Sequence, residues 1–586
     1  MGQKAPYTHQ PATFSMLIKM MVIVLLVNML SACNFPSRTA QEPLSIDALY
    51  SNLLKTLTPQ PGQLLSTEPP EPTAFQPDAV TQNVSPTNET KMLFLHPGLP
   101  TSFLAGLDFN ALSSTEDENL AAVKVFLSGD PAEFPESSDI TWIYALAAPF
   151  YTITDEISFA DLANYWRGET SLLENFSIIY LTDPTKAAMI TIFGEPDSNA
   201  VQTVPQADLL SLAANSEPIL VILPFEELNP RWKVLGVEGQ SPIQDDFRPK
   251  NYPLSVHIWV AGEEMITLPE SNYHPNKRTT VTMTGVTALT RATAYQMETR
   301  GVNFPAQDIV DWLTASDLTH ISNEVPFAAN CPYPDPVQKD LIFCSNPAYM
   351  ELFEFIGADV IELTGNHLLD YGIEAINLTL NMYDAQGLPA YGGGWTLSEA
   401  RTPVKITHHG NQLAFLGCNL PGPYSNFATD QQPGAAACGD YEWLIEEIKR
   451  AKDEDYLPIV SIQYYEDYTS YPSSQMMIDF QRLADAGAVA VFGSQAHTPK
   501  VMAFHNDSFI HYGLGNLFFD QMEVYYNDTL MPHTREEFVD RLIFYDGRLI
   551  SVELRTAMLE DYARPRPMSI EERQYFLNRI FSAANE

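Results

Sequence analysis

Polar side chains that can bind metal ions or move protons gather at a few short points of the chain. Asn366, His367 and Asp370 lie in the stretch IELTGNHLLDYG, directly after a short apolar run. Glu324 follows Asn323 at the end of another apolar run, in LTHISNE. A carboxylate, an imidazole and an amide oxygen that converge can hold one or two divalent ions, which then activate water.

Three later stretches, SIQYYEDY, GSQAHTPK and YGLGNLFFDQ, add residues of the same kinds. If the site is catalytic, Glu324 or Glu466 is the candidate general base, and His367 or His497 is the candidate metal ligand or acid. The predicted catalytic residues are Glu324, His367, Glu466 and His497. The predicted binding residues are Asn323, Asn366, Gln463, Gln495 and Asn516.

Each of these residues also has a structural explanation when it is taken alone. A single histidine at the end of a strand is most often a hydrogen-bonded structural residue. Asn366 can form an Asx turn, and Asp370 can cap a helix that begins near Ile373. The occurrence of several polar clusters at equivalent points favours a shared functional site.

Repeated helix–strand–loop units must position these clusters. The plan of NPAYMELFEFIGADVIELTGNH recurs in YEWLIEEIKRAKDEDYLPIVSIQYYED and in SSQMMIDFQRLADAGAVAVFGSQAHTPK. The helix of the last unit is expected to bury one face and to end at Gly487. The residues of that face are Met476, Met477, Phe480, Leu483 and Ala484. The strands are apolar on both faces, which is typical of a sheet covered by helices on both sides. In such α/β sheets the functional residues lie just past the carboxyl ends of the strands.

The ordered motifs of residues 278 to 525 resemble those of the CapA family, the poly-γ-glutamate capsule-synthesis proteins with a metallophosphatase-like fold. The motifs are Thr284-Gly285, Asn323-Glu324, GNHLLDYG, the strand leading to Glu466, DAGAVAVFGSQAH and IHYGLGNLFFDQ. The resemblance implies a four-layer α/β sandwich with a metal-type centre, preceded here by a smaller α/β domain. It also implies a role in the assembly or export of a capsule polymer, as a hydrolase or transferase. The alternative is a non-catalytic surface protein that binds a small molecule or an anionic polymer.

The sequence departs from the family at four positions of the metal centre. Val286 stands where the family usually carries an aspartate, and Gly365 where it usually carries an asparagine. Gln463 and Gln495 stand where histidines are usual. Neutral glutamine binds a divalent ion far more weakly than imidazole or carboxylate does. We therefore expect either one weakly held divalent ion of unknown identity, such as Mg²⁺ or Ca²⁺, or a metal-free polar pocket. The ligands of such an ion would be Glu324, Asn366, His367 and His497.

The N-terminal residues predict export. Residues 1–33 fit a lipoprotein signal peptide, with an apolar run followed by Leu30-Ser31-Ala32-Cys33, where Cys33 would carry the lipid. A short anchor helix with an incidental cysteine is the alternative. Residues 34–92 are rich in Pro, Ser and Thr and are expected to form a linker. The protein is then extracytoplasmic and lipid-anchored to the bacterial cell membrane.

Three further segments follow the linker. Residues 93–265 alternate short apolar runs with helical stretches and loosely resemble an α/β solute-binding domain. Residues 278–555 form the CapA-like domain, which is expected to end in a hairpin with Asp-Gly at its turn. Residues 556–586 are expected to form a C-terminal helical tail.

The number of cysteines and the net charge indicate the compartment of the protein and exclude one class of partner. Apart from Cys33, the four cysteines are Cys331, Cys344, Cys418 and Cys438. An even number fits disulfides in an oxidising compartment, and the local pairing 331–344 with 418–438 is the simplest of three. A zinc site made by these thiols is the rival explanation, although the chain has no Cys-x-x-Cys pair. The formal net charge of −41 argues against a nucleic-acid partner, which requires a basic surface.

Overall fold

The computed structural model describes residues 91–108, 112–130, 140–170, 173, 175–214, 217–262, 266–522, 524–526 and 529–584. The predicted signal peptide, Cys33 and nearly all of the predicted linker lie outside these residues. Of the helices that are described, none has both the length and the apolar character needed to cross a bilayer.

The first sheet of the described chain is mixed, with parallel and antiparallel pairs. Its strand order is β2-β1-β3-β10-β4-β8-β6-β7, and β9 pairs with both β4 and β5. The strands are β1 (Met92–Leu95), β2 (Ser113–Thr115), β3 (Val123–Ser128), β4 (Ile140–Pro149), β5 (Glu156–Ile157), β6 (Ile179–Leu181), β7 (Val201–Thr203), β8 (Leu220–Pro224), β9 (Trp232–Val237) and β10 (Ser255–Gly262). Helices α4 (Phe159–Trp166) and α5 (Asp183–Phe193) contribute buried residues to the core of this sheet.

The second sheet carries the first two sequence motifs. Its order is β15-β14-β13-β11-β26-β27-β28, with β12 beside β13. The strands are β11 (Arg278–Thr284), β12 (Val286–Thr287), β13 (Leu318–Asn323), β14 (Val360–Glu362), β15 (Ala390–Tyr391), β26 (Glu536–Tyr545), β27 (Arg548–Glu560) and β28 (Arg564–Pro567). Strands β11, β13, β14 and β15 are parallel, as the helix–strand repeat predicts.

The third sheet carries the later motifs. Its order is β17-β18-β20-β21-β23-β22, and its central pairs are parallel. The strands are β17 (Val404–His408), β18 (Asn411–Asn419), β20 (Leu457–Gln463), β21 (Ala490–Ser494), β22 (Met502–His505) and β23 (Ser508–His511).

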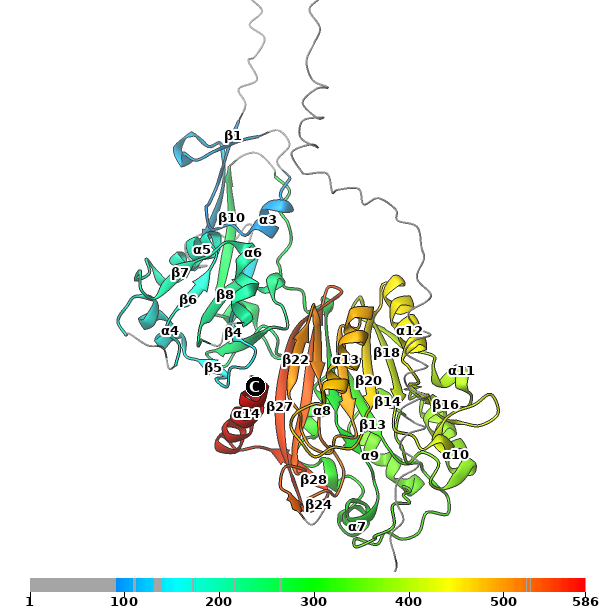
Figure 1. The fold of residues 1–586 in the computed structure, drawn as a ribbon. Helices are drawn as coiled ribbons and strands as arrows, with labels where there is room; N and C mark the ends of the chain where they lie inside the picture. Colours follow the sequence, from blue (N-terminus) through cyan, green and yellow to red (C-terminus); the bar gives the residue numbers. More distant parts are fainter. Residues whose placement is uncertain are drawn as a thin grey trace, which may run out of the picture. The chain divides into compact units, whose positions relative to one another are not determined.

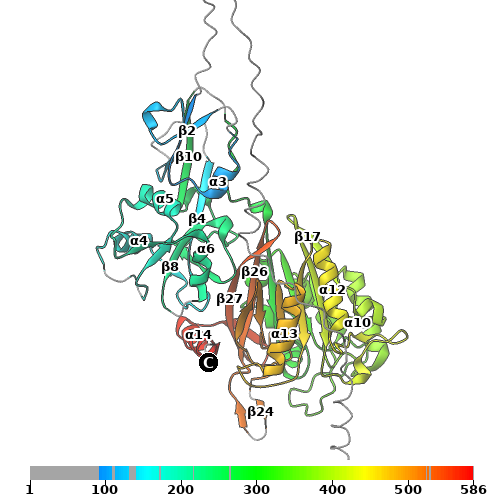
Figure 2. The ribbon, with the colours of Figure 1, turned by 45° about the horizontal axis from the view of Figure 1, so that its top comes forward.

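Helices cover the two C-terminal sheets and make the predicted four-layer α/β sandwich. Helices α7 (Arg291–Arg300), α8 (Val310–Thr314), α9 (Met350–Phe355) and α10 (Gly372–Gln386) pack on β13 and β14. Helices α12 (Glu442–Asp453) and α13 (Ser474–Ala486) pack on the third sheet, and buried residues of both sheets share one core (Figure 1). Figure 2 shows α14 (Ile570–Ala584) beside β27, and apolar residues of both belong to that same core.

Local sequence signals explain where α13 begins and ends. The Ser473 hydroxyl accepts a hydrogen bond from the backbone N–H of Met476, and Gly487 ends the helix in the left-handed region at φ 116°. The predicted apolar face is buried except for Met477, which is 37% exposed. Met477 was wrongly placed because it is one residue past Met476 and therefore turns away from the core.

The C-terminal residues continue the second sheet before the final helix. The predicted hairpin is present, with Asp546 at φ 49° and Gly547 at φ 76° between β26 and β27. Strand β27 runs on to Glu560 and β28 pairs with it, so that the helical part of the predicted tail is α14. The predicted domain boundaries otherwise stay predictions.

Candidate functional site

The predicted polar clusters meet at one pocket of about 610 Å³. They follow the carboxyl ends of β13, β14, β20 and β21, the four parallel strands whose loops were expected to converge. The predicted residues that line the pocket are Glu324, Asn366, His367, Glu466, Gln495 and His497. The other three, Asn323, Gln463 and Asn516, are fully buried and hydrogen-bond to their neighbours instead.

Gln463 joins Glu324 to Asn366. Its Nε2 group donates to Oε1 of Glu324 at 3.3 Å and to Oδ1 of Asn366 at 3.1 Å. Its Oε1 accepts from the Ser494 hydroxyl at 2.8 Å. The amide therefore places N–H donors between two oxygens that would otherwise be free to share a cation.

His367 is oriented by Asp370. Its Nδ1 lies 2.7 Å from Oδ2 of Asp370, which also accepts from the backbone N–H of Phe343 at 2.8 Å. Because Nδ1 is engaged there, Nε2 is the nitrogen that can meet a ligand. Burial lowers the pKa of His367, but the hydrogen bond to Asp370 and the charge of Glu324 outweigh burial and raise it. The alternative in which Asp370 caps α10 is wrong, since Tyr371 precedes that helix and makes no side-chain cap.

His497 and Gln495 lie on a loop with an unusual backbone. Nδ1 of His497 is 2.8 Å from Oδ1 of Asn516, whose Nδ2 donates to the Thr534 carbonyl at 3.2 Å. Gln495 and His497 have φ values of 67° and 49°, in the left-handed region that side chains rarely adopt. Gln495 is 5% exposed, and within the described residues its Oε1 has no hydrogen-bond partner. A buried, unpaired acceptor in a pocket is a natural binding point for a ligand N–H.

Two of the departures from the family pattern have a packing explanation. A Cβ atom at Gly365 would lie 2.7 Å from Cα of Glu324, so the backbone after β14 approaches Glu324 more closely than an asparagine allows. Val286 is fully buried in an apolar cluster beside the pocket. The other members of that cluster are Ala288, Val325, Phe343 and Phe519.

Comparisons with known proteins agree with the motifs. Residues 280–521 match the model of the family described as "Bacterial capsule synthesis protein PGA_cap". This region is a CapA-family domain. The chain is similar to "PGA biosynthesis protein CapA" of Bacillus subtilis (strain 168), with 25% identity over 228 residues that cover 38% of this chain and 59% of that protein. It is also similar to "Capsule biosynthesis protein CapA" of Bacillus anthracis, with 24% identity over 268 residues, 45% of this chain and 64% of that protein.

The aligned part thus spans about three fifths of each of these curated relatives. Among solved structures, a putative 5'-nucleotidase from Staphylococcus aureus in complex with α-ketoglutarate has 10% identity. The matched part covers 52% of this chain and 58% of the nucleotidase chain, with a TM-score of 0.30. The predicted likeness of residues 93–265 to a solute-binding domain stays a prediction.

The CapA domain has an incomplete set of ligands for a metal centre. Nε2 of His367 and of His497 remain available, but Val286 supplies no ligand and Gln463 presents N–H donors to Glu324 and Asn366. Among the described residues, one group of three His, Cys, Asp or Glu side chains has its donor atoms within 4.8 Å of one another. That group lies outside this pocket. As arranged, these side chains fit a metal-free polar pocket better than a metal centre, and the divalent ion stays a prediction.

Sequence reasoning missed the cation of the pocket. Arg291, the first residue of α7, forms an ion pair with Asp520, which also accepts from the N–H of Ala292 at 3.0 Å. The Arg291 guanidinium lies 5.0 Å from the ring centre of Phe343 and 5.1 Å from that of Phe519. Burial raises the pKa of Asp520, although Arg291 opposes this rise. Asp520 lies within the motif IHYGLGNLFFDQ and Arg291 follows the Thr284-Gly285 motif, but only the fold brings the two residues together.

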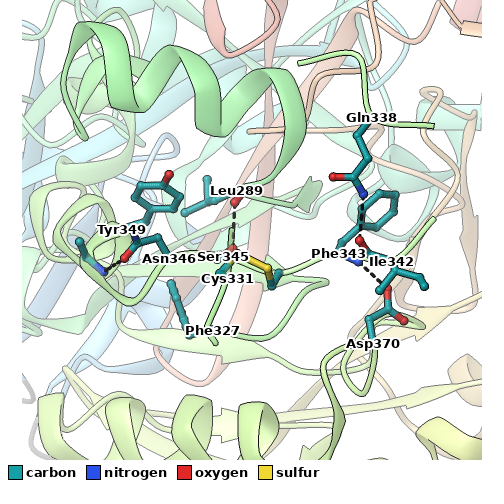
Figure 3. Close-up of a disulfide and its surroundings, with 12 residues drawn as sticks. Leu289, Phe327, Cys331, Gln338, Ile342, Phe343, Ser345, Asn346, Tyr349 and Asp370 are labelled. Atoms are coloured by element: carbon teal, nitrogen blue, oxygen red, sulfur yellow. Dashed lines mark hydrogen bonds between the residues drawn. A yellow bond between two sulfur atoms is a disulfide. The ribbon is translucent and has the colours of Figure 1, made fainter. Parts of the chain in front are cut away.

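A disulfide closes one wall of the CapA pocket. Cys331 pairs with Cys344, and Cys418 with Cys438, which confirms the local pairing and excludes a zinc site made by these thiols. Figure 3 shows the first bridge next to Phe343, whose ring centre lies 4.6 Å from that of His367. The loop between Cys331 and Cys344 contributes several lining residues: Pro336, Gln338, Leu341 and Phe343.

Proposed function

We propose that this chain is an extracytoplasmic, lipid-anchored factor in the assembly or export of a poly-γ-glutamate-type capsule polymer, and that the CapA pocket binds a segment of that polymer. Capsule-synthesis relatives and the family match support the pathway. The lipobox-like Leu30–Cys33 segment supports the anchor. Two disulfides support an oxidising compartment.

The unpaired amide oxygen of Gln495 is the observation that carries the binding role. A γ-linked glutamate polymer alternates amide N–H groups with carboxylates. Gln495 can accept a hydrogen bond from such an N–H, while Arg291 and protonated His367 can meet a carboxylate. The amide N–H and the carboxylate of the polymer repeat then each have a complementary group in the same pocket.

The His367–Asp370 pair favours a second candidate function, hydrolysis or transfer at the polymer's amide bonds. A histidine whose pKa is raised by a hydrogen-bonded carboxylate keeps its proton to a higher pH than a free imidazole does, and it can donate that proton to a leaving amine. Glu324 lies in the same pocket and can act as the base that accepts a proton from water or from an acceptor amine. Neither role requires a metal ion.

Calorimetric titration of the full chain with poly-γ-glutamate separates these functions. We expect Gln495→Ala to weaken polymer binding by about tenfold, because the loss of one buried hydrogen bond costs about 1.4 kcal/mol. His505→Ala is the control, since His505 lies outside the pocket and its loss should leave the affinity unchanged. Release of new amino ends, lost in Glu324→Gln, would establish catalysis. Unchanged affinity in both Gln495→Ala and His367→Ala would contradict binding at this pocket.

A further inference from the structure

A second group of metal-binding side chains lies at the opposite end of the C-terminal sheets. Asp317 directly precedes β13, while His408 ends β17 and His409 begins the turn to β18. One donor atom of each of these three residues lies within 4.8 Å of a donor atom of the others. Because β13 is six residues long, about 20 Å separates Asp317 from Glu324 in the CapA pocket. This group is therefore distinct from the pocket.

Hydrogen bonds set the tautomer of both imidazoles. The Thr279 hydroxyl donates its single proton to the carbonyl oxygen of His408 at 2.8 Å. The 3.1 Å contact between that hydroxyl and Nδ1 of His408 therefore requires a proton on Nδ1. Nδ1 of His409 lies 2.7 Å from the carbonyl oxygen of Arg278 and must also be the donor. In the neutral form of both rings, Nε2 therefore carries the lone pair through which histidine binds metal ions.

Hydrogen bonds also orient the carboxylate of Asp317. Its Oδ2 accepts from the backbone N–H of Thr280 at 2.8 Å and from the Thr280 hydroxyl at 2.9 Å. Its Oδ1 lies 4.0 Å from Nε2 of His408, too far for a hydrogen bond between them. Oδ2 of Asp317 is thus fixed by Thr280, and Oδ1 faces Nε2 of His408 at 4.0 Å.

We propose that Asp317, His408 and His409 form a binding site for a transition-metal ion of the zinc class. Two imidazoles and one carboxylate, each oriented by hydrogen bonding at its other polar atom, are a common ligand set for zinc, and water completes the tetrahedron. Bonds of about 2.0–2.1 Å place tetrahedral ligand atoms about 3.3 Å apart, so binding draws these side chains together by roughly an ångström. Mg²⁺ and Ca²⁺ prefer oxygen ligands and are not expected here.

The position of the site gives the ion a structural effect. Asp317 directly precedes β13 of the second sheet, whereas His408 and His409 belong to a hairpin of the third sheet. A bound ion therefore links the two sheets at the edge opposite the pocket. The side chains of Asp317 and His408 are 29% and 32% exposed and His409 is exposed, so an ion reaches them from solvent.

Zinc titration of the full chain tests this site by stoichiometry, affinity and melting temperature. The background carries His367→Ala and His497→Ala, so that the CapA pocket contributes no imidazole. In that background we expect one zinc ion per chain, and a melting temperature that rises with zinc because the ion binds the folded state. His409→Ala and Asp317→Asn should weaken this binding by at least about tenfold, since each removes one of three ligands.

Two further measurements make the test decisive. His505→Ala is the matched control, because His505 is also partly exposed and lies 2.7 Å from a carboxylate oxygen of Asp485. It should leave zinc binding unchanged. Co²⁺ should give the visible absorption of a tetrahedral site, and His409→Ala should abolish it. Wild-type stoichiometry and affinity in both His409→Ala and Asp317→Asn, or no binding in the background at about 100 µM zinc, would overturn the proposal.

Discussion

At the residue scale, the contact of His367 with Asp370 makes stability depend on pH. The pKa of His367 is raised in the folded chain above its ordinary value of 6.5. The folded state therefore binds this proton more tightly than the unfolded state does. The stabilisation is fully present below about pH 6.5 and is lost as the pH rises through the raised pKa.

His367→Ala should remove this pH-dependent part of the stability. The difference in free energy of unfolding between the wild type and the variant should be largest near pH 5.5 and should shrink towards about pH 8.5. Urea unfolding at several pH values measures this difference, and His505→Ala, in another partly exposed His–Asp pair, serves as the control. A wild-type-minus-variant difference that stays constant across this range would contradict the interpretation.

Gly365 gives a second residue-scale prediction. Gly365→Asn restores the residue usual in the family, yet its Cβ would meet Cα and the carbonyl oxygen of Glu324, both at 2.7 Å. Because those atoms are backbone, we expect a loss of about 1–3 kcal/mol of stability and no gain in metal affinity. Thermal unfolding and metal titration of the variant measure both. Higher metal affinity at wild-type stability would show instead that this backbone adapts.

At the element scale, the bridge from Cys331 to Cys344 supports a wall of the pocket. Replacing both cysteines by serine opens a loop whose ends are 13 residues apart, which should cost on the order of 3 kcal/mol. Phe343 packs against His367 and under Arg291, so polymer binding should weaken as well. Unfolding and calorimetry together measure the two effects.

The bridge from Cys418 to Cys438 is the matched control for this element. Its ends are 20 residues apart, and neither its cysteines nor the loop between them lines the pocket. Removing it should cost a similar free energy of unfolding while leaving polymer affinity largely unchanged. Equal losses of affinity in the two double variants would mean that general destabilisation, rather than the wall, controls binding.

The elements also explain how far the sequence predicts the site. Helix–strand repeats place polar loops at the carboxyl ends of parallel strands, so the convergence of Glu324, Asn366 and His367 followed from local patterns. The buried contact of His320 with Glu362, at 3.3 Å between the neighbouring strands β13 and β14, did not. The Ser494 hydroxyl lies 2.9 Å from Oε1 of Glu362 and 2.8 Å from Oε1 of Gln463, which connects this pair to the pocket. Such pairs join residues far apart in sequence, and no periodicity reveals them.

At the scale of the whole molecule, the net charge of −41 opposes the proposed partner. An anionic polymer approaching this chain is repelled over the Debye length, which is about 30 Å at 0.01 M salt and about 8 Å at 0.15 M. Inside the pocket, Arg291 and protonated His367 attract the polymer's carboxylates at short range, where salt screens buried groups less.

Salt should therefore strengthen the binding of poly-γ-glutamate between about 0.01 M and about 0.15 M, the reverse of its effect on a basic polymer-binding protein. Calorimetry of the full chain across this range measures the dissociation constant. An uncharged γ-glutamyl amide oligomer is the control, and its affinity should hardly change, because long-range repulsion does not act on it. Weaker polymer binding with added salt would place the attraction on an exposed basic surface instead, and Arg291→Ala would then leave the salt dependence unaltered.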